Sequence, residues 1–422
     1  LVHFIRKVVA EDLDLSDVYS AYESTLGQPP YHPGLMTALL LYSYSRAVYT
    51  SRRIEVACLE RLDFRALVGA ERPDHSTISE FRKRHREALE RLFVQVLALC
   101  RDAGMVKLGH VALDGTKMRA NASKHAAMSY KRMKEAEPEL ARQVESWMDE
   151  AQQGDDADDA SLGKDKRGDE IPAHIREKAR KLVKIQSATA RLEAEAQAKK
   201  EQLEAERAAK EAEQGRPIRG PRPKALDGVP EDKAQANFTD PESRIMKTAN
   251  GFEQAYNAQA AVDSEHQLIV AHAVTNEQND GRQLKAMLDR IEANLSKSPA
   301  QLSADAGYCS EENLEELERR KIDGYIATGR QKHGTSSPAS GDPTNSRPRA
   351  TAMREKLREG GWEGPYRLRK QTVEPVFGQI KEPRGFRRFL RRGLANVAGE
   401  WALLCTVHNL LKLAAMRSAC PA

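Results

Sequence analysis

The stretch His110–Ser123, HVALDGTKMRANAS, decides the fold class of this chain. Its short apolar run, VAL, leads directly into Asp114 and Gly115, a pattern typical of a buried strand with an acidic residue at its end. The residues before it are helical in pattern, and strand patterns return later in the chain. We therefore expect an α/β protein whose sheet begins here.

Strand and helix patterns alternate on the C-terminal side of this stretch. The apolar alternation and the turn residues predict a hairpin, a helix, a strand that ends in Asp305, a second helix and a last strand. These elements are expected over 256–262 with 267–274, 279–295, 301–305, 311–321 and 325–328. A polar loop follows over 329–349. Residues 350–422 read as helical and basic, with 16 Lys and Arg against 6 Asp and Glu from Asn345 onward.

Residues 1–105 on the N-terminal side read as helical. The segment 35–49 is apolar all round and predicts a buried helix, followed by helices over 52–62 and 64–68. Thr77 and Glu80 have the spacing of a capping box, so a long helix should begin near 76–77.

Residues 123–235 differ in composition from both flanks. The middle is almost entirely Ala, Glu, Lys, Arg and Gln, which predicts either a solvated helical hairpin or a marginal coiled coil. Weak heptad positions are Ile175, Leu182, Ala196 and Leu203, with Thr189 among them. We expect a charged insertion with loop-like flanks.

Composition excludes several classes of protein. The chain has 422 residues, 67 basic and 62 acidic, and a net charge of +5. No apolar run approaches the ~20 residues of a membrane span, and no secretory signal pattern is present. The five cysteines form no CxxC pair, which favours buried thiols in a reducing cytoplasm. The chain begins with Leu1, which indicates either a non-ATG start codon translated literally or a missing N-terminus, and we favour a truncation of a few tens of residues at most.

Three carboxylates carry the chemistry that we expect. Asp114 and Asp305 follow strands, and ligands bind at strand ends in open sheets. Glu374 lies in a basic helical segment, YRLRKQTVEPVFGQIK. Together they would repel one another, and hard divalent cations would remove that repulsion. Asp263 and Asp280 are rival acids; Asp263 is discounted because it falls at a hairpin tip.

The ordinary alternatives remain open for each of these residues. An Asp before Gly is often a turn residue, and a Glu in a charged helix is often solvated. Arg82, Lys83 and Arg84 lie on either the reading helix of a helix-turn-helix-like unit or a plain amphipathic helix. The arginines after Glu374 favour phosphate binding over a merely soluble surface. They are Arg384, Arg387, Arg388, Arg391 and Arg392.

The sequence resembles the DDE transposases of bacterial insertion sequences. The resemblance rests on HVALDGTKMRANAS, DPESRIMKT with YNAQAAVD, NDGRQL, LSADAGYCS and YRLRKQTVEPVFGQIKEPRGFRR, with PYHPGLMTALLLYSYS and RPDHSTISEFRKRH near the start. It implies a ribonuclease H-like mixed-sheet core preceded by an all-α DNA-binding domain. The expected domains are 1–105 for the helical domain, 106–122 with 236–392 for the core, 123–235 for the insertion and 393–422 for a C-terminal helix.

The resemblance also implies the site. Asp114, Asp305 and Glu374 would be the catalytic triad and hold two Mg²⁺ or Mn²⁺ ions. Relatives carry a Tyr, a basic residue three later, Glu four further on and Lys seven beyond. Here Glu374 and Lys381 keep the last spacing. Arg369 stands at the expected distance from Tyr366 but one residue too far from Glu374, and Lys370 shows the reverse, so both remain candidates.

Further basic residues are predicted to contact DNA. Arg367, Lys370, Glu374 and Lys381 share roughly one helical face. Pro375 either kinks this helix and so orients Glu374, or marks its start. The complete set predicted to bind DNA is Arg82, Lys83, Arg84, Arg367, Lys370, Lys381, Arg384, Arg387, Arg388 and Arg391.

The implied function is transposition. Such an enzyme cleaves the terminal inverted repeats of its element as a metal-dependent endonuclease and joins the freed 3′-hydroxyls to target DNA. Synapsis of two ends implies a homodimer or larger assembly in the cytoplasm, at the nucleoid, without a membrane. One alternative is a decayed, non-catalytic protein that still occupies element ends. Another is a metal-dependent nuclease that cuts without strand transfer.

Overall fold

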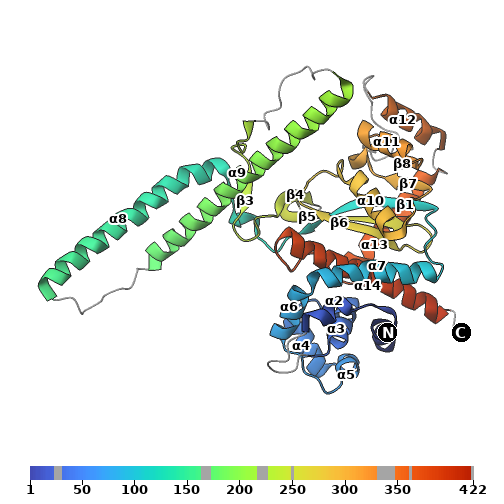
Figure 1. Ribbon diagram of the computed structural model, residues 1–422, viewed down its shortest axis with the longest axis horizontal. Coiled ribbons are helices and arrows are strands. Elements are labelled where there is room, and N and C mark those ends of the chain that lie inside the picture. The colour runs from blue at the N-terminus through green and yellow to red at the C-terminus, as the bar shows by residue number, and fades with distance from the viewer. Residues whose placement is uncertain are drawn as a thin grey trace. The chain divides into compact units, whose positions relative to one another are not determined.

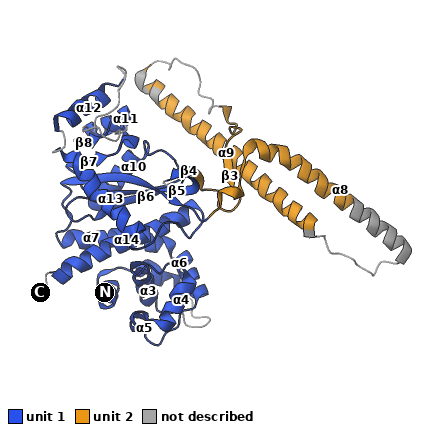
Figure 2. Cartoon of the chain, turned by 180° about the vertical axis from the view of Figure 1, so that it is seen from behind, with its two compact units in different colours: residues 1–121, 246–422 blue, residues 122–245 orange. Residues whose placement is uncertain are grey.

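The computed structural model describes residues 1–22, 31–162, 173–215, 227–248, 251–329, 347–360 and 364–419. Contacts divide the chain into two compact units, coloured separately in Figure 2. Unit 1 comprises residues 1–121 and 246–422, and unit 2 comprises residues 122–245. The predicted insertion thus overlaps unit 2, whereas the N-terminal helices and the sheet share unit 1.

A mixed six-stranded sheet forms the centre of unit 1 (Figure 1). Its strands are β1 (His110–Arg119), β4 (Arg244–Thr248), β5 (Gly251–Asp263), β6 (Ile269–Thr275), β7 (Gln301–Ala304) and β8 (Asp323–Ile326). The order is β4-β5-β1-β7-β8, and β6 also pairs with β5. β5 runs antiparallel to β1 and β6, whereas β7 and β8 continue the sheet in parallel on the other side. The predicted α/β class with a mixed sheet is confirmed.

β1 is longer than the sequence predicts. The apolar run suggested a strand that ends at Asp114, but β5 pairs with β1 as far as Arg119 and Ala255. The parallel partner β7 stops earlier, at the pair Leu113 and Ala304. Asp114 therefore lies within β1, and yet it stands where the parallel part of the sheet ends, beside Asp305.

Helices surround this sheet. In unit 1 they are α1 (Val2–Lys7), α2 (Ser16–Tyr19), α3 (Pro33–Ser45), α4 (Ser51–Glu60), α5 (Leu62–Val68), α6 (His75–Arg84), α7 (Arg86–Asp102), α10 (Gln283–Leu295), α11 (Glu311–Arg319), α12 (Pro348–Gly360), α13 (Leu368–Lys381) and α14 (Leu394–Ala419). α3 is buried from Met36 to Tyr44, as its all-round apolar sequence predicts. No helix in the described part of the chain has the length and hydropathy that crossing a bilayer requires.

The predicted long helix after residue 76 is two helices. Asp74 caps the first, because its Oδ1 accepts hydrogen bonds from the backbone N–H of Ser76 (2.8 Å) and of Thr77 (3.0 Å). Asp74, three residues before Thr77, therefore caps this helix in place of the expected capping box of Thr77 and Glu80. The chain then leaves helical geometry at His85, and α7 starts anew. The basic residues Arg82, Lys83 and Arg84 therefore form the end of a short helix.

α14 lies between the sheet and the N-terminal helices (Figure 1). The indole N–H of Trp401, which is fully buried, donates to the carbonyl oxygen of Gln259 in β5 over 3.0 Å. The amide of Asn409 bonds to both backbone groups of Ile269, at 2.9 and 2.8 Å. These bonds fasten α14 to the sheet and satisfy polar groups that would otherwise be buried without partners.

His408 on the same helix makes the stability of unit 1 depend on pH. Its Nε2 is 2.8 Å from the carbonyl oxygen of Gln267, and its Nδ1 is 3.5 Å from a nitrogen of Arg384, so the ring is neutral. Burial, with Arg384 beside it, lowers the pKa of His408 to about 3. Because the unfolded chain binds the proton more readily, stability falls as the pH drops below 6.5, by about 2 kcal/mol at pH 5.

We expect His408→Gln to reduce this dependence without abolishing it, because burial also lowers the pKa of His272 to about 3. Urea unfolding of the variant and of the unaltered protein between pH 7 and pH 5 measures the difference. Equal slopes for both proteins would contradict the assignment of a neutral buried ring.

Unit 2 is a helical hairpin on a small strand pair. α8 (Tyr130–Leu162) and α9 (Ala173–Gln214) pack together, and β2 (Ala127–Ser129) pairs with β3 (Gln235–Asn237). The described core joins these elements through Tyr130, Met133, Ile185, Ala188, Leu192 and Ala236. The middle part, for which a hairpin or a coiled coil was expected, is one continuous helix, α9. Its partner α8 extends to Leu162, so the expectation of a loop-like flank is wrong over that part of the acidic segment. Of the predicted heptad positions Ile175 is buried, but Leu182, Ala196 and Leu203 are only half-buried. Between Ile185 and Leu192 the buried face follows the strand pair and the start of α8 instead.

Candidate active site

Asp114 and Asp305 stand side by side where the parallel strands end. Oδ1 of Asp114 accepts a hydrogen bond from the N–H of Gly115 over 2.8 Å. Asp305 follows β7 directly and caps a 3₁₀ turn at Ala306–Tyr308, accepting from the N–H of Gly307 over 2.9 Å. The register of β1 with β7 therefore places the two predicted carboxylates together.

Burial disfavours the ionised form of both carboxylates. Burial raises the pKa of Asp114 to about 6; Arg369 opposes this increase and Asp305 adds to it. Burial also raises the pKa of Asp305, and the charge of Asp280 adds to that increase. Two acids so close together in a dry environment favour a bound cation.

The rival acid Asp280 belongs to the same place. Its Oδ1 accepts hydrogen bonds from the side-chain amides of Asn257 (2.6 Å) and Gln259 (2.7 Å), and it lies 3.4 Å from Nζ of Lys117. Its Oδ2 and Oδ1 of Asp305 face the same side of Gly307, 3.3 and 3.0 Å from where a Cβ would stand. Sequence reasoning named Asp280 but had no signal that would bring it beside Asp305.

Asp263, the other rival, is structural. Its Oδ2 accepts from the backbone N–H groups of Leu108 (2.7 Å) and Lys107 (3.2 Å), and its Oδ1 accepts from Glu265 (3.0 Å). These bonds fix the entry to β1. Asp263 is the buried last residue of β5, paired with Val111, and does not lie at the hairpin tip where the sequence suggested it.

Gly115 leaves the room that this cluster needs. A Cβ there would stand 2.6 Å from Oδ1 of Asp280 and 2.8 Å from Oδ1 of Asn257, with the amide of Gln259 also in contact. The amide of Gln259 is itself held, because the hydroxyl of Tyr308 donates to its Oε1. None of these side chains can retreat without losing a hydrogen bond.

We therefore expect Gly115→Ala to destabilise the fold by about 1–3 kcal/mol through overpacking. Gly109→Ala is the matched control, since a Cβ at Gly109 would meet nothing within 4 Å. Thermal unfolding of both variants measures the difference. Equal melting temperatures would show that the cluster around Asp280 is loose.

Arg369 lies between Glu374 and Asp114 and contacts both side chains. Nη1 of Arg369 donates to Oδ2 of Asp114 over 2.8 Å, and Nη2 lies 3.8 Å from Oε1 of Glu374. The side chain of Glu374 is 53% exposed. Among the described residues, no three His, Cys, Asp or Glu side chains are grouped closely enough to hold a metal ion as they stand. The structure thus brings Asp114, Asp305 and Asp280 together and leaves Glu374 at the rim.

Pro375 lies within α13 and does not start it. The helix begins at Leu368, so the interpretation in which it starts at Pro375 is wrong. A proline leaves the carbonyl four residues earlier without its helical donor. Here that carbonyl, of Gln371, accepts from the side-chain amide of Gln267 over 3.0 Å. This contact allows Glu374 and Arg369 to share one continuous helix.

The basic residues of α13 divide into two groups. Arg369 is buried beside the aspartates and bonded to Tyr366, whereas Lys370 is exposed, so Arg369 is the basic residue that accompanies Tyr366 in the site. The ammonium group of Lys381 donates to the hydroxyl of Thr116, two residues beyond Asp114. Burial lowers the pKa of Lys381, and Asp114 partly restores it. A cation thus stands on each side of Asp114.

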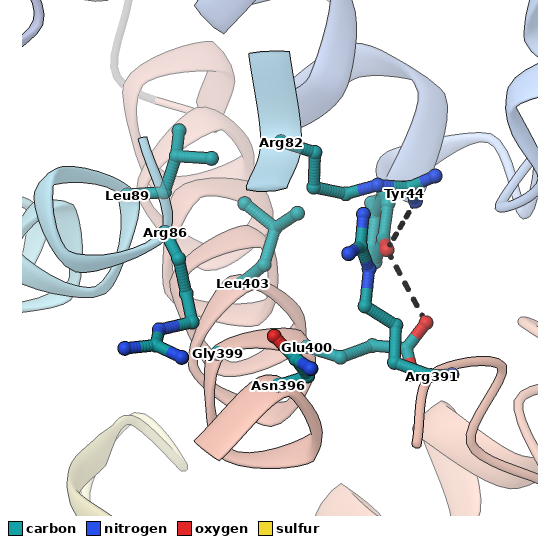
Figure 3. A pocket seen from close by; sticks show the side chains of 9 residues that line it. All are labelled: Tyr44, Arg82, Arg86, Leu89, Arg391, Asn396, Gly399, Glu400 and Leu403. Atoms are coloured by element: carbon teal, nitrogen blue, oxygen red, sulfur yellow. Dashed lines mark hydrogen bonds between the residues drawn. The ribbon is translucent and has the colours of Figure 1, made fainter. Parts of the chain in front are cut away.

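Arg82 and Arg391, both predicted to bind DNA, line an interior pocket (Figure 3). Nη1 of Arg82 donates to the hydroxyl of Tyr44 over 3.0 Å, and that hydroxyl lies 3.5 Å from Oε1 of Glu400. The other oxygen of Glu400 accepts from the N–H groups of Leu390 (2.9 Å) and Arg391 (3.3 Å). Both arginines are half-buried, and their positive charges lie near the carboxylate of Glu400.

Two further predicted DNA contacts have internal partners. The guanidinium of Arg84 donates to the carbonyl oxygen of Ala21 and lies over the ring of Tyr22, 5.1 Å from its centroid. Arg384 contacts His408, and burial lowers the pKa of Arg384. The exposed members of the predicted set are Lys83, Arg84, Arg367, Lys370, Arg387 and Arg388. Of these six side chains, only Arg84 has the internal partners described above.

Two families match the sequence. Residues 215–410, which include Asp305 and Glu374, match the family described as Transposase DDE domain. Residues 1–84 match the family described as Transposase domain (DUF772). No curated protein and no solved structure matches the chain significantly.

Both matches are to transposase domains, so the class is that of enzymes that process nucleic acids. The chain belongs to the DDE-type transposases of insertion sequences. Asp114 lies between the two matched segments, and its place in the site is supported by the register of β1 with β7.

Proposed function

We propose that the chain is a catalytically active transposase that cuts the ends of its insertion sequence and joins them to target DNA. The observation that carries the proposal is the pairing of Asp114 with Asp305 where parallel strands end, with Arg369 and Lys381 beside Asp114. The strand order supports a ribonuclease H-like core, since β6, β5 and β1 are antiparallel and β7 and β8 extend the sheet in parallel.

The donor set fits a pair of hard divalent cations. Asp114 and Asp305 offer carboxylate oxygens, which Mg²⁺ and Mn²⁺ prefer. Glu374 is the third predicted ligand, and it would complete the site by turning inward from its exposed position. Two such ions, when bound, activate the attacking oxygen and stabilise the leaving oxygen of a phosphodiester.

The chain's own cations act on the DNA backbone. Lys381, buried next to Asp114, is placed to bind the phosphate at the scissile bond. The exposed side chains of Lys83, Arg367, Lys370, Arg387 and Arg388 would bind flanking phosphates of the terminal repeats and the target. Two ends must be held together for joining, so we propose a homodimer or larger synaptic assembly, at the nucleoid where the DNA lies.

The decayed-binder alternative is not favoured. A chain that has lost catalysis has no need for buried, mutually repelling acids, yet Asp114, Asp305 and Asp280 remain close together. A nuclease without strand transfer would share the cutting site, and only the reaction products separate it from a transposase.

The test uses a plasmid that carries the two ends of the element, incubated with the protein and Mg²⁺, Mn²⁺ or EDTA. We expect cuts at both ends and joined products with either metal, and none with EDTA. Cutting without joining would favour the nuclease. Binding without cutting would overturn the proposal in favour of the decayed binder.

A further inference from the structure

Arg369 occupies the centre of the acidic site. Its side chain is only 10% exposed, and it touches Asp114 at 2.8 Å and approaches Glu374 at 3.8 Å. Oδ1 of Asp114 already accepts from Gly115, so with Arg369 on Oδ2 both oxygens of this carboxylate are engaged. Any cation that binds Asp114 must share or replace these contacts.

The groups around Arg369 are mainly acidic and stabilise its positive charge. Burial lowers the pKa of Arg369, but Asp114, Tyr366, Asp305 and Glu374 raise it, and the net direction is upward. The three acidic residues among these neighbours, Asp114, Asp305 and Glu374, are the three proposed metal ligands. Its Nε is buried without a hydrogen-bond partner, so part of the guanidinium is poorly satisfied where it stands. A guanidinium always carries its charge, and it matches carboxylate and phosphate equally well.

We propose that Arg369 is a resident counter-ion that competes with divalent cations for Asp114 and Glu374 and is released when DNA phosphate binds it. This inference rests on the proposed function. With Arg369 on the carboxylates, the site is neutralised without metal and metal affinity is low. A phosphate that draws Arg369 away uncovers both carboxylates, so DNA and metal binding reinforce one another.

The arrangement would restrict the chemistry to the complex with DNA. Release of Arg369 also frees Glu374 to turn inward, because the contact that faces it toward Arg369 is lost. Arg369 is a positioning residue in this account: it governs when the ligands are available.

The test measures binding of Mn²⁺ alone to the whole protein, by calorimetry or by the loss of the free-ion paramagnetic resonance signal. We expect Arg369→Gln to bind Mn²⁺ about tenfold more tightly than the unaltered protein when DNA is absent. The unaltered protein should gain affinity when a DNA end lacking a cleavable phosphodiester is added, and the variant should gain much less. Arg358→Gln, which removes an exposed charge of α12 that has no proposed role, should match the unaltered protein.

A second variant, Arg369→Lys, keeps the inference testable if Arg369→Gln fails to fold. Arg369→Lys keeps the charge on a single point, so it should fold and bind Mn²⁺ with intermediate affinity. Equal Mn²⁺ affinity in the unaltered protein, Arg369→Gln and Arg369→Lys would overturn the inference and leave the metal site standing. Absence of Mn²⁺ binding in every protein, with and without DNA, would overturn the proposed function as well.

Discussion

Asp114→Asn is expected to reduce both end cleavage and strand transfer by about a thousandfold or more, while binding to the element's ends persists. The substitution keeps the shape of the side chain and the bond from Gly115, but it removes the negative charge that a divalent cation needs. It also removes the partner that holds Arg369 at 2.8 Å. Asp305→Asn should behave alike, since its carboxylate lies beside the same site.

Glu374→Gln is expected to abolish DNA cleavage without affecting folding. Its side chain is 53% exposed, so the variant should fold with unchanged stability and still lose cleavage. Asp280→Asn should reduce cleavage less, by about ten- to a hundredfold, because Asp280 holds the side-chain amides of Asn257 and Gln259 and is not one of the three proposed metal ligands. The exposed turn residue Glu265 provides a control, and Glu265→Gln should cut normally. Full cutting by any triad variant would remove that residue from the site.

Glu400→Ala is expected to cost the largest amount of stability, about 3–5 kcal/mol. Glu400 is 4% exposed and accepts hydrogen bonds from the backbone N–H groups of Leu390 and Arg391. Its other oxygen faces Tyr44, to which Arg82 donates. Truncation would leave these backbone donors without their acceptor and remove a nearby counter-charge of Arg82, whose Nη1 keeps the carbonyl oxygen of Tyr49 as an acceptor at 2.9 Å.

Urea unfolding measures this loss. Glu382→Ala, at an exposed glutamate of the same C-terminal region, should change stability by less than about 1 kcal/mol. Glu400→Gln should fall between the two, since it keeps an acceptor and loses the charge. A loss of under about 1 kcal/mol in Glu400→Ala would mean that water replaces the carboxylate, contrary to the closed cluster described above.

Much of the fold could be predicted from local pattern. Apolar runs bounded by turn residues located β1, β7 and β8, and the all-round apolar composition of 35–49 predicted the burial of α3. The length of β1 could not be predicted, because it depends on β5, a partner distant in the sequence. The break at His85 likewise comes from packing, since α7 turns to lie against α14.

Residues of the candidate site could be predicted where their position in a strand brings them together. They could not be predicted where side-chain packing brings them together. Asp114 and Asp305 lie at strand positions that any parallel pair brings together. The place of Asp280 depends on the amides of Asn257 and Gln259, which the sequence does not connect to it. Arg82 and Arg391 look like solvated cations in the sequence, and only the structure shows that they are half-buried beside Glu400.

The insertion of unit 2 between β1 and β5 imposes an order on biosynthesis. β1 is synthesised before residues 122–245, and its antiparallel partner β5 is synthesised only afterwards. α8 and α9 meet through contacts that are local by comparison, so the hairpin can form while β5 is still being translated. A folded hairpin shortens the effective loop that β1 and β5 must close. We therefore expect the insertion to ease the pairing of β1 with β5 during folding.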